Sequence, residues 1–169
     1  MEFGACLGAE IADSLKGFAL LEDEPMEIAF DKVLRSITVP LLRPIEEVIA
    51  NCIFRERGIS GCTDSGLVLA DLAPSEGFAS ELVLGLGVYK RGIPWRWADG
   101  SSHTGSPALI AHFVVVVLAP NDSIRLNAIR TISNTFRTGR EPGRSIIDAR
   151  SLEQAVAIVR EFEGRSKQA

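Results

Sequence analysis

Apolar residues recur at helical spacing in four segments of the chain. One such stripe follows Pro25 and stops at Pro40, which predicts a helix that begins near Pro25. A second stripe begins at Pro44 and ends at Gly58. A third follows the candidate N-caps of 121–123, and a fourth follows Ser151. The stripes comprise Met26, Phe30, Val33 and Ile37; Ile45, Val48, Ile49 and Cys52; Ile129, Ile132 and Phe136, in line with Arg125; and Leu152, Ala155, Val156, Val159 and Phe162.

The middle of the chain favours strands instead. Short apolar runs at 66–72, 81–89 and 108–119 predict three strands, and the last contains four consecutive valines at 114–117. A β-branched run of this kind is typical of a strand that is covered on both faces. The Gly-, Pro- and Ser-rich stretch 92–107 predicts a loop between the second and third strands.

Helices that alternate with buried strands indicate an α/β fold, in which helices cover both faces of a mixed β-sheet. The 169 residues are expected to form one domain, with a core at 25–165. For residues 1–24 the pattern leaves three alternatives open: an extra strand, an arm for dimerisation, or a loosely ordered tail.

Composition narrows the class of protein. The net charge is −4 and the basic residues are dispersed, which argues against a nucleic-acid partner. Three scattered cysteines and two histidines give little support for a metal site, and no cofactor is expected. The N-terminus lacks the basic start of a signal peptide, and the longest apolar run, 113–119, is too short to insert in a bilayer. A cytoplasmic protein is therefore expected.

Three stretches, in order, resemble the EIIA proteins of the fructose, mannitol and nitrogen-related phosphotransferase systems. Residues 55–71, RERGISGCTDSGLVLAD, are similar to the family's helix end, glycine-containing loop and strand ending in Ile-Pro-His. Gly92-Ile93-Pro94-Trp95, followed by Asp99-Gly100, Pro107 and the strand to Pro120, resembles a second family element. The helix after Ser151 resembles the family's final helix. The resemblance covers roughly 45–165 and implies the EIIA fold.

In that family, a histidine at the end of the first strand accepts a phosphoryl group. The matching position here is Asp71, preceded by Ala70 in place of proline. A second family histidine, near the start of the helix after the long strand, has Arg125 as its nearest counterpart if the loop is about two residues shorter. The resemblance therefore implies an EIIA scaffold without its phosphohistidine. If the fold brings Asp71 and Arg125 together, they could form an ion pair that imitates the occupied state; otherwise both are solvated at the rim of a former pocket.

The remaining candidates each carry two interpretations. Asp64 and Trp95 join Asp71 and Arg125 as predicted binding residues, although Trp95 and Trp97 more commonly pack a loop onto a sheet. His112 fits a structural histidine inside a strand, and His103 fits an exposed loop residue. If the chain were a phosphocarrier, Asp71, His103 or His112 would have to accept the phosphoryl group. The arginines Arg137, Arg140 and Arg144, with two glycines among them, could bind an anion or form a solvated loop.

The resemblance implies a regulatory or signalling domain that binds a protein partner, such as a phosphocarrier protein, a transporter or a kinase, without histidine phosphorylation. Two alternatives remain open at this point: an active phosphocarrier, and a sensor that binds a small molecule near Asp71, Arg125 and Trp95. Homo-oligomerisation also remains open.

Overall fold

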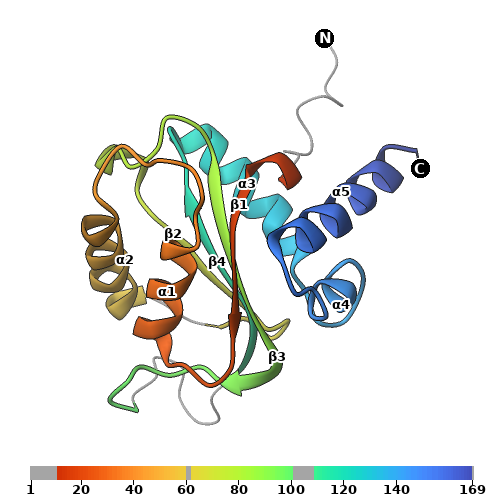
Figure 1. The fold of residues 1–169 in the computed structure, drawn as a ribbon, viewed down its shortest axis with the longest axis horizontal. Helices are drawn as coiled ribbons and strands as arrows, with labels where there is room; N and C mark the ends of the chain where they lie inside the picture. Colours follow the sequence, from red (N-terminus) through yellow and green to blue (C-terminus); the bar gives the residue numbers. More distant parts are fainter. Residues whose placement is uncertain (1–10, 60–61, 101–108, 169) are drawn as a thin grey trace.

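A four-stranded mixed sheet forms the centre of the protein (Figure 1). The computed structural model describes residues 11–59, 62–100 and 109–168. The strands are β1 (Leu15–Leu21), β2 (Leu67–Asp71), β3 (Val83–Pro94) and β4 (Ile110–Leu118), in the order β1-β3-β4-β2. The central strands β3 and β4 are antiparallel, whereas β1 pairs in parallel with β3 and β2 in parallel with β4. The predicted mixed α/β fold is confirmed.

Helices cover both faces of this sheet (Figure 1). On one face lie α1 (Met26–Arg35) and α2 (Ile45–Ile59), and on the other lie α3 (Asp122–Thr135), α4 (Gly143–Ile146) and α5 (Leu152–Gln168). Two short 3-10 turns, η2 (Ala12–Ser14) and η3 (Pro74–Glu76), complete the described elements. All four predicted helices are present.

The valine run of β4 explains why two helical layers form. Val114 and Val116 belong to the apolar core beneath α1 and α2, whereas Val115 and Val117 belong to the core beneath α3 and α5. All four are completely buried, as alternation along a strand with two covered faces requires. At roughly 1.5 kcal/mol or more for each buried valine side chain, this one strand contributes substantially to the stability of both cores.

Helix α1 approaches the sheet closely because glycines lie beneath it. A Cβ atom built on Gly87 would lie 2.7 Å from both Leu21 Cδ1 and Val33 Cγ2, and one on Gly85 would lie 2.8 Å from Val33 Cγ1. Leu84 and Leu86, which alternate with these glycines along β3, face the core beneath α3 and α5 on the other side of the sheet. Glycine on this face of β3 thus sets the separation between the sheet and α1.

Two predicted boundaries differ from the structure. Helix α1 ends at Arg35 instead of continuing toward Pro40, because the Ser36 hydroxyl donates to the Val33 carbonyl at 2.6 Å and Ile37 packs onto the core from beyond the helix. Strand β3 continues to Pro94, inside the predicted 92–107 loop. Pairing with β4 resumes at Ile93 after an irregularity, where Gly92 has a φ of 71°.

Of the three alternatives for residues 1–24, the extra strand is present at Leu15–Leu21. This strand, β1, pairs with β3 at the edge of the sheet. Just before it, Glu163 of α5 accepts hydrogen bonds from the backbone N–H groups of Ile11 and Ala12, each at 2.9 Å. Ile11 and Ala12 are buried in the core beneath α3 and α5, so packed residues also lie ahead of the predicted 25–165.

Candidate functional site

The site is formed where strand β2 ends. Val68 and Ala70 of β2 face the core beneath α1 and α2, whereas Leu67 and Leu69 face the core beneath α3 and α5. Alternation along the strand therefore directs Asp71, its last residue, toward the α3 side of the sheet. Asp71 is paired in register with Val117 of β4, which is followed closely by α3.

The first turn of α3 positions Arg125. As predicted, a polar residue caps this helix: the Asn121 side chain accepts a hydrogen bond from the Ile124 N–H at 2.9 Å. The Arg125 N–H then bonds to the Asn121 carbonyl at 3.1 Å, which fixes the backbone from which the guanidinium extends. A lone cation in the first turn opposes the helix dipole, so Arg125 gains from anionic neighbours.

Asp71 and Arg125 form an ion pair. Arg125 Nη1 donates to Asp71 Oδ2 at 2.6 Å, and Arg125 Nε contacts Asp122 Oδ1 at 3.3 Å. The Asp71 and Arg125 side chains are 21% and 22% exposed, so water is partly excluded from their contact. The hydrogen bond to Asp71 raises the pKa of the Arg125 guanidinium, which keeps it charged. Of the two alternatives for these residues, the structure has the ion pair.

Exposed apolar side chains flank Arg125 in the sequence of α3. Ile124 is 37% exposed and Leu126 is 54% exposed. The sequence did not single out either residue, although Leu126 lies off the predicted stripe of Ile129, Ile132 and Phe136 and could have been noticed for that reason. Apolar groups of this kind beside a charged pair are common where proteins bind one another.

A second apolar feature lies at the same end of the sheet, on the loop between α1 and α2. Thr38 N–H donates to the Lys16 carbonyl at 2.9 Å, at the start of β1, and Leu42 N–H donates to the Phe78 carbonyl at 2.9 Å, in the segment that follows β2. These two bonds hold the loop beside the end of the sheet where Asp71 lies. Leu42 itself is 61% exposed.

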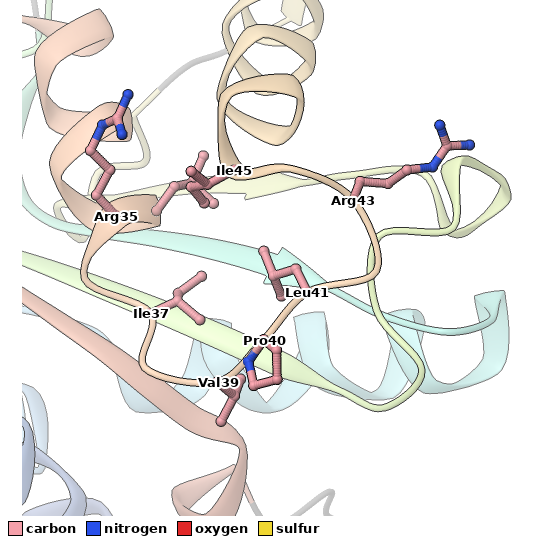
Figure 2. A pocket seen from close by; sticks show the side chains of 8 residues that line it. Arg35, Ile37, Val39, Pro40, Leu41, Arg43 and Ile45 are labelled. Carbon is pink, nitrogen blue, oxygen red and sulfur yellow. The ribbon is translucent and has the colours of Figure 1, made fainter.

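This loop encloses a shallow recess of about 330 Å³ (Figure 2). Arg35 and Arg43 lie on its two sides. Arg35 is paired with Asp31 of α1 at 3.0 Å, and Arg43, in the loop before α2, is paired with Glu47 of α2 at 2.9 Å. The interior is aliphatic, and no sequence motif marks it. It is lined by Leu34, Ile37, Val39, Pro40, Leu41 and Ile45 in addition to the two arginines.

The other two predicted binding residues do not join Asp71 and Arg125. Asp64 precedes β2, so the strand separates it from Asp71 by roughly 15 Å or more. Trp95 follows the end of β3, and the antiparallel register of β3 and β4 places that end away from Asp71. Trp95 is 2% exposed and packs edge-on against Phe30, with ring centroids 5.7 Å apart. Trp95 is therefore buried at the opposite end of the sheet from the Asp71–Arg125 pair.

The described histidine has a structural environment. His112 Nδ1 lies 3.1 Å from the Tyr89 carbonyl, and the His112 side chain contacts the bend of β3 at Gly92. His103 lies outside the described residues. Burial raises the pKa of the Cys62 thiol to about 11 and that of Cys52 further, so neither is a nucleophile at neutral pH.

Metal-binding clusters and membrane-spanning helices are both absent from the described ranges 11–59, 62–100 and 109–168. Within them, no group of three or more His, Cys, Asp or Glu side chains is placed to bind a metal ion. Within the same ranges, none of the helices combines the length and the apolar character needed to cross a bilayer.

Comparison with known proteins bears on the fold. The nitrogen regulatory protein IIA-Ntr from Neisseria meningitidis superposes with a TM-score of 0.63 at 14% identity, over 89% of this chain and 99% of that chain. The IIA mannitol protein from Escherichia coli gives 0.59 at 12% identity, over 94% and 99%. The mannitol-specific cryptic phosphotransferase enzyme IIA CmtB from Escherichia coli gives 0.58 at 13%, over 90% and 99%.

These similarities confirm the predicted resemblance at the level of the fold: the chain has the fold of phosphotransferase-system EIIA proteins. The sequence matches no protein-family model and no curated relative.

Proposed function

We propose that this chain is an EIIA-like regulatory domain that binds a protein partner through the end of the sheet at Asp71 and does not undergo histidine phosphorylation. The observation that carries the proposal is the 2.6 Å contact between Asp71 and Arg125. These two residues stand where the family resemblance leads one to expect a phosphorylatable histidine and its helper. A permanent pair of opposite charges there would give the domain one fixed state.

The chemistry of the pair argues against Asp71 as a phosphoacceptor. Asp71 Oδ2 accepts a short, charge-assisted hydrogen bond from a guanidinium, which stabilises the carboxylate charge and makes it a weaker nucleophile toward a phosphoryl group. Arg125 is also a permanent cation, which cannot accept or release a proton near neutral pH as a histidine can. A neutral, nucleophilic ring nitrogen is thus replaced by a charge-balanced contact.

The surroundings of the pair support protein binding. The exposed side chains of Leu42, Ile124 and Leu126 and the aliphatic recess of Figure 2 lie at the same end of the sheet as the pair. We name these three residues, the recess and the pair the docking end. An apolar partner side chain that enters the recess would be held between the Arg35 and Arg43 rims, while polar partner groups meet the charged pair.

The partner is proposed to be a phosphocarrier protein, a transporter or a kinase, and the domain is proposed to act in the cytoplasm. The fold similarity to IIA-Ntr gives a nitrogen-related regulatory role its only support. The alternative is an active phosphocarrier, which would require Asp71, His103 or His112 to accept phosphate. His112 has its Nδ1 near the Tyr89 carbonyl and lies toward the start of β4, away from the docking end.

Binding of a purified phosphocarrier protein, measured by isothermal titration calorimetry, tests the proposal. We expect Leu126→Asp to weaken binding at least tenfold, because a charge would be buried in an apolar contact. Phe54→Asp is the matched control: Phe54 is 83% exposed, but it lies on α2 outside the docking end, so its replacement should leave the affinity unchanged. Equal losses in both variants, or no binding of the wild type, would count against this docking end.

A further inference from the structure

A pocket of about 340 Å³ lies at the opposite end of β2 from Asp71. Its lining comes from two segments: Asp64 and Ser65, which precede β2, and 137–140, which follow α3. Arg125 lies in the first turn of α3 and the pocket lies beyond its last residue. Since α3 is about 20 Å long, most of the helix length separates the two. We call it the arginine pocket, because Arg137 and Arg140 both line it.

The backbone of the arginine pocket is held firmly. Thr138 N–H donates to the Ser65 carbonyl at 3.0 Å, which ties the two lining segments together. Arg144 Nη2 donates to the Gly139 carbonyl at 2.8 Å. A Cβ atom on Gly143 would lie only 1.8 Å from the Arg137 carbonyl oxygen, so the chain closes tightly on itself there. A ligand would therefore meet a preformed loop and lose little binding energy in ordering it.

Opposite charges line the arginine pocket without neutralising one another. Within residues 11–59, 62–100 and 109–168, no ion pair of 4.0 Å or less joins Arg137 or Arg140 to a carboxylate. Asp64 likewise has no cationic partner in those ranges. Two guanidinium groups and one carboxylate, all at least partly exposed and without an ion-pair partner in these ranges, thus border one space. This differs from the rims of the recess in Figure 2, where Arg35 and Arg43 have acid partners.

This charge pattern selects a ligand with two negative groups and one positive group. Each guanidinium can bind a carboxylate, and Asp64 can accept hydrogen bonds from an ammonium group. The Ser65 and Thr138 hydroxyls add neutral hydrogen-bonding groups. A phosphate ion would satisfy the arginines but would bring negative charge toward Asp64 and leave that carboxylate unpaired. We propose that the arginine pocket binds an acidic α-amino acid, of the size of aspartate or glutamate.

The ligand's separate groups can be tested one at a time by NMR titration, with the Thr138 and Gly139 amides as reporters. L-Glutamate is compared with glutarate, which lacks the ammonium group, and with 4-aminobutyrate, which lacks one carboxylate. For a ligand of this size in an open pocket we expect a Kd of about 1 mM for glutamate. Glutarate and 4-aminobutyrate should each bind about tenfold more weakly.

Variants assign the ligand's groups to residues. Arg137→Gln and Arg140→Gln should each weaken glutamate binding about tenfold. Asp64→Asn should weaken glutamate binding by a similar factor but leave glutarate binding unchanged or tighter, because only glutamate carries the ammonium group. Arg130→Gln, an exposed arginine of α3 that does not line the pocket, is the control and should change neither.

Three results would overturn the proposal: no shift of the Thr138 and Gly139 amides with glutamate, equal affinity for glutamate and glutarate in the wild type, or tighter binding of inorganic phosphate than of glutamate. The melting temperature of each variant is measured alongside, so that a loss of binding is not confused with a loss of fold. The outcome does not depend on docking at Asp71, because the two surfaces lie at opposite ends of β2.

Discussion

The Asp71–Arg125 contact joins two residues that are 54 positions apart in the sequence, one at the end of a strand and one in the first turn of a helix. Both side chains are about four-fifths buried, so solvent screens their attraction less than at a fully exposed pair. A carboxylate and a guanidinium also fit each other's hydrogen-bonding geometry. The pair is thus expected to hold its arrangement in the free protein, before any partner binds.

A double-mutant cycle measures this interaction. With Asp71→Asn, Arg125→Gln and the double variant, urea unfolding should give a coupling free energy of about 1 kcal/mol for the pair. The matched control is Asp13–Arg160, whose N···O distance of 2.7 Å is similar but whose side chains are 75% and 63% exposed. Its coupling should be about 0.3 kcal/mol or less. Equal coupling energies at the two pairs would show that burial does not strengthen the Asp71–Arg125 contact.

At the scale of single residues, the sequence located this pair but not its surroundings. The family resemblance led to Asp71 and, with a shorter loop, to Arg125, and the fold brings the two side chains together. Asp64 lies in the same sequence stretch as Asp71, and Trp95 lies in the next stretch, yet neither residue is near the pair. Residues that are close in sequence can lie at opposite ends of a strand. Which of them are neighbours in space is known only once the pairing of the strands is known.

The packing of α1 on β3 depends on glycine at Gly87. Replacement by alanine would place a Cβ atom 2.7 Å from Leu21 Cδ1 and Val33 Cγ2, so these side chains would have to move. We expect Gly87→Ala to lower the free energy of unfolding by about 1 kcal/mol or more. The control is Gly164→Ala in α5, where nothing lies within 4 Å of the added atom and the better helix former should raise stability by about 0.5 kcal/mol. Urea unfolding of both variants measures these changes. If Gly87→Ala raised the free energy of unfolding, the close packing of α1 on β3 at Gly87 would be refuted.

The cap of α3 makes a separate prediction. Asn121→Ala removes the acceptor for the Ile124 N–H and should cost about 1 kcal/mol of unfolding free energy. Asn121→Asp keeps an oxygen acceptor at the helix N-terminus and should retain most of that stability. Thermal and urea unfolding provide the measurement. If aspartate is as damaging as alanine, the side-chain cap does not hold the helix start that positions Arg125.

Among the elements, those with a strong local pattern could be predicted and those formed by tertiary pairing could not. The valine run of β4 and the apolar stripes of the helices are visible without a structure. The segment Leu15–Leu21 contains a lysine and a glycine and no β-branched residue, so only its pairing with β3 identifies it as a strand. Pro94 and Gly92 suggested a loop, but a local irregularity lets β3 continue through both.

Across the whole molecule, the sheet separates two surfaces with different chemistry. The docking end combines a satisfied ion pair with exposed apolar groups, which suits a protein partner. The arginine pocket has charges of both signs on a firmly held loop, and none of them has an ion-pair partner among the described residues, which suits a small polar ligand. Strand β2 and helix α3 each run from one surface to the other, since Asp64 and Asp71 bracket the strand and Arg125 and Arg137 lie toward the two ends of the helix.

We propose that this EIIA-like scaffold carries a fixed ion pair at the position where the family resemblance places a phosphohistidine. This proposal is tested by phosphoryl transfer from phosphoenolpyruvate through purified general carriers, followed by intact mass spectrometry, with the phosphocarrier protein's own mass gain as the positive control. The wild type should gain no phosphoryl group, whereas Asp71→His should gain one. A gain of one phosphoryl group by the wild type would overturn the proposal and identify the chain as an active phosphocarrier with a relocated acceptor.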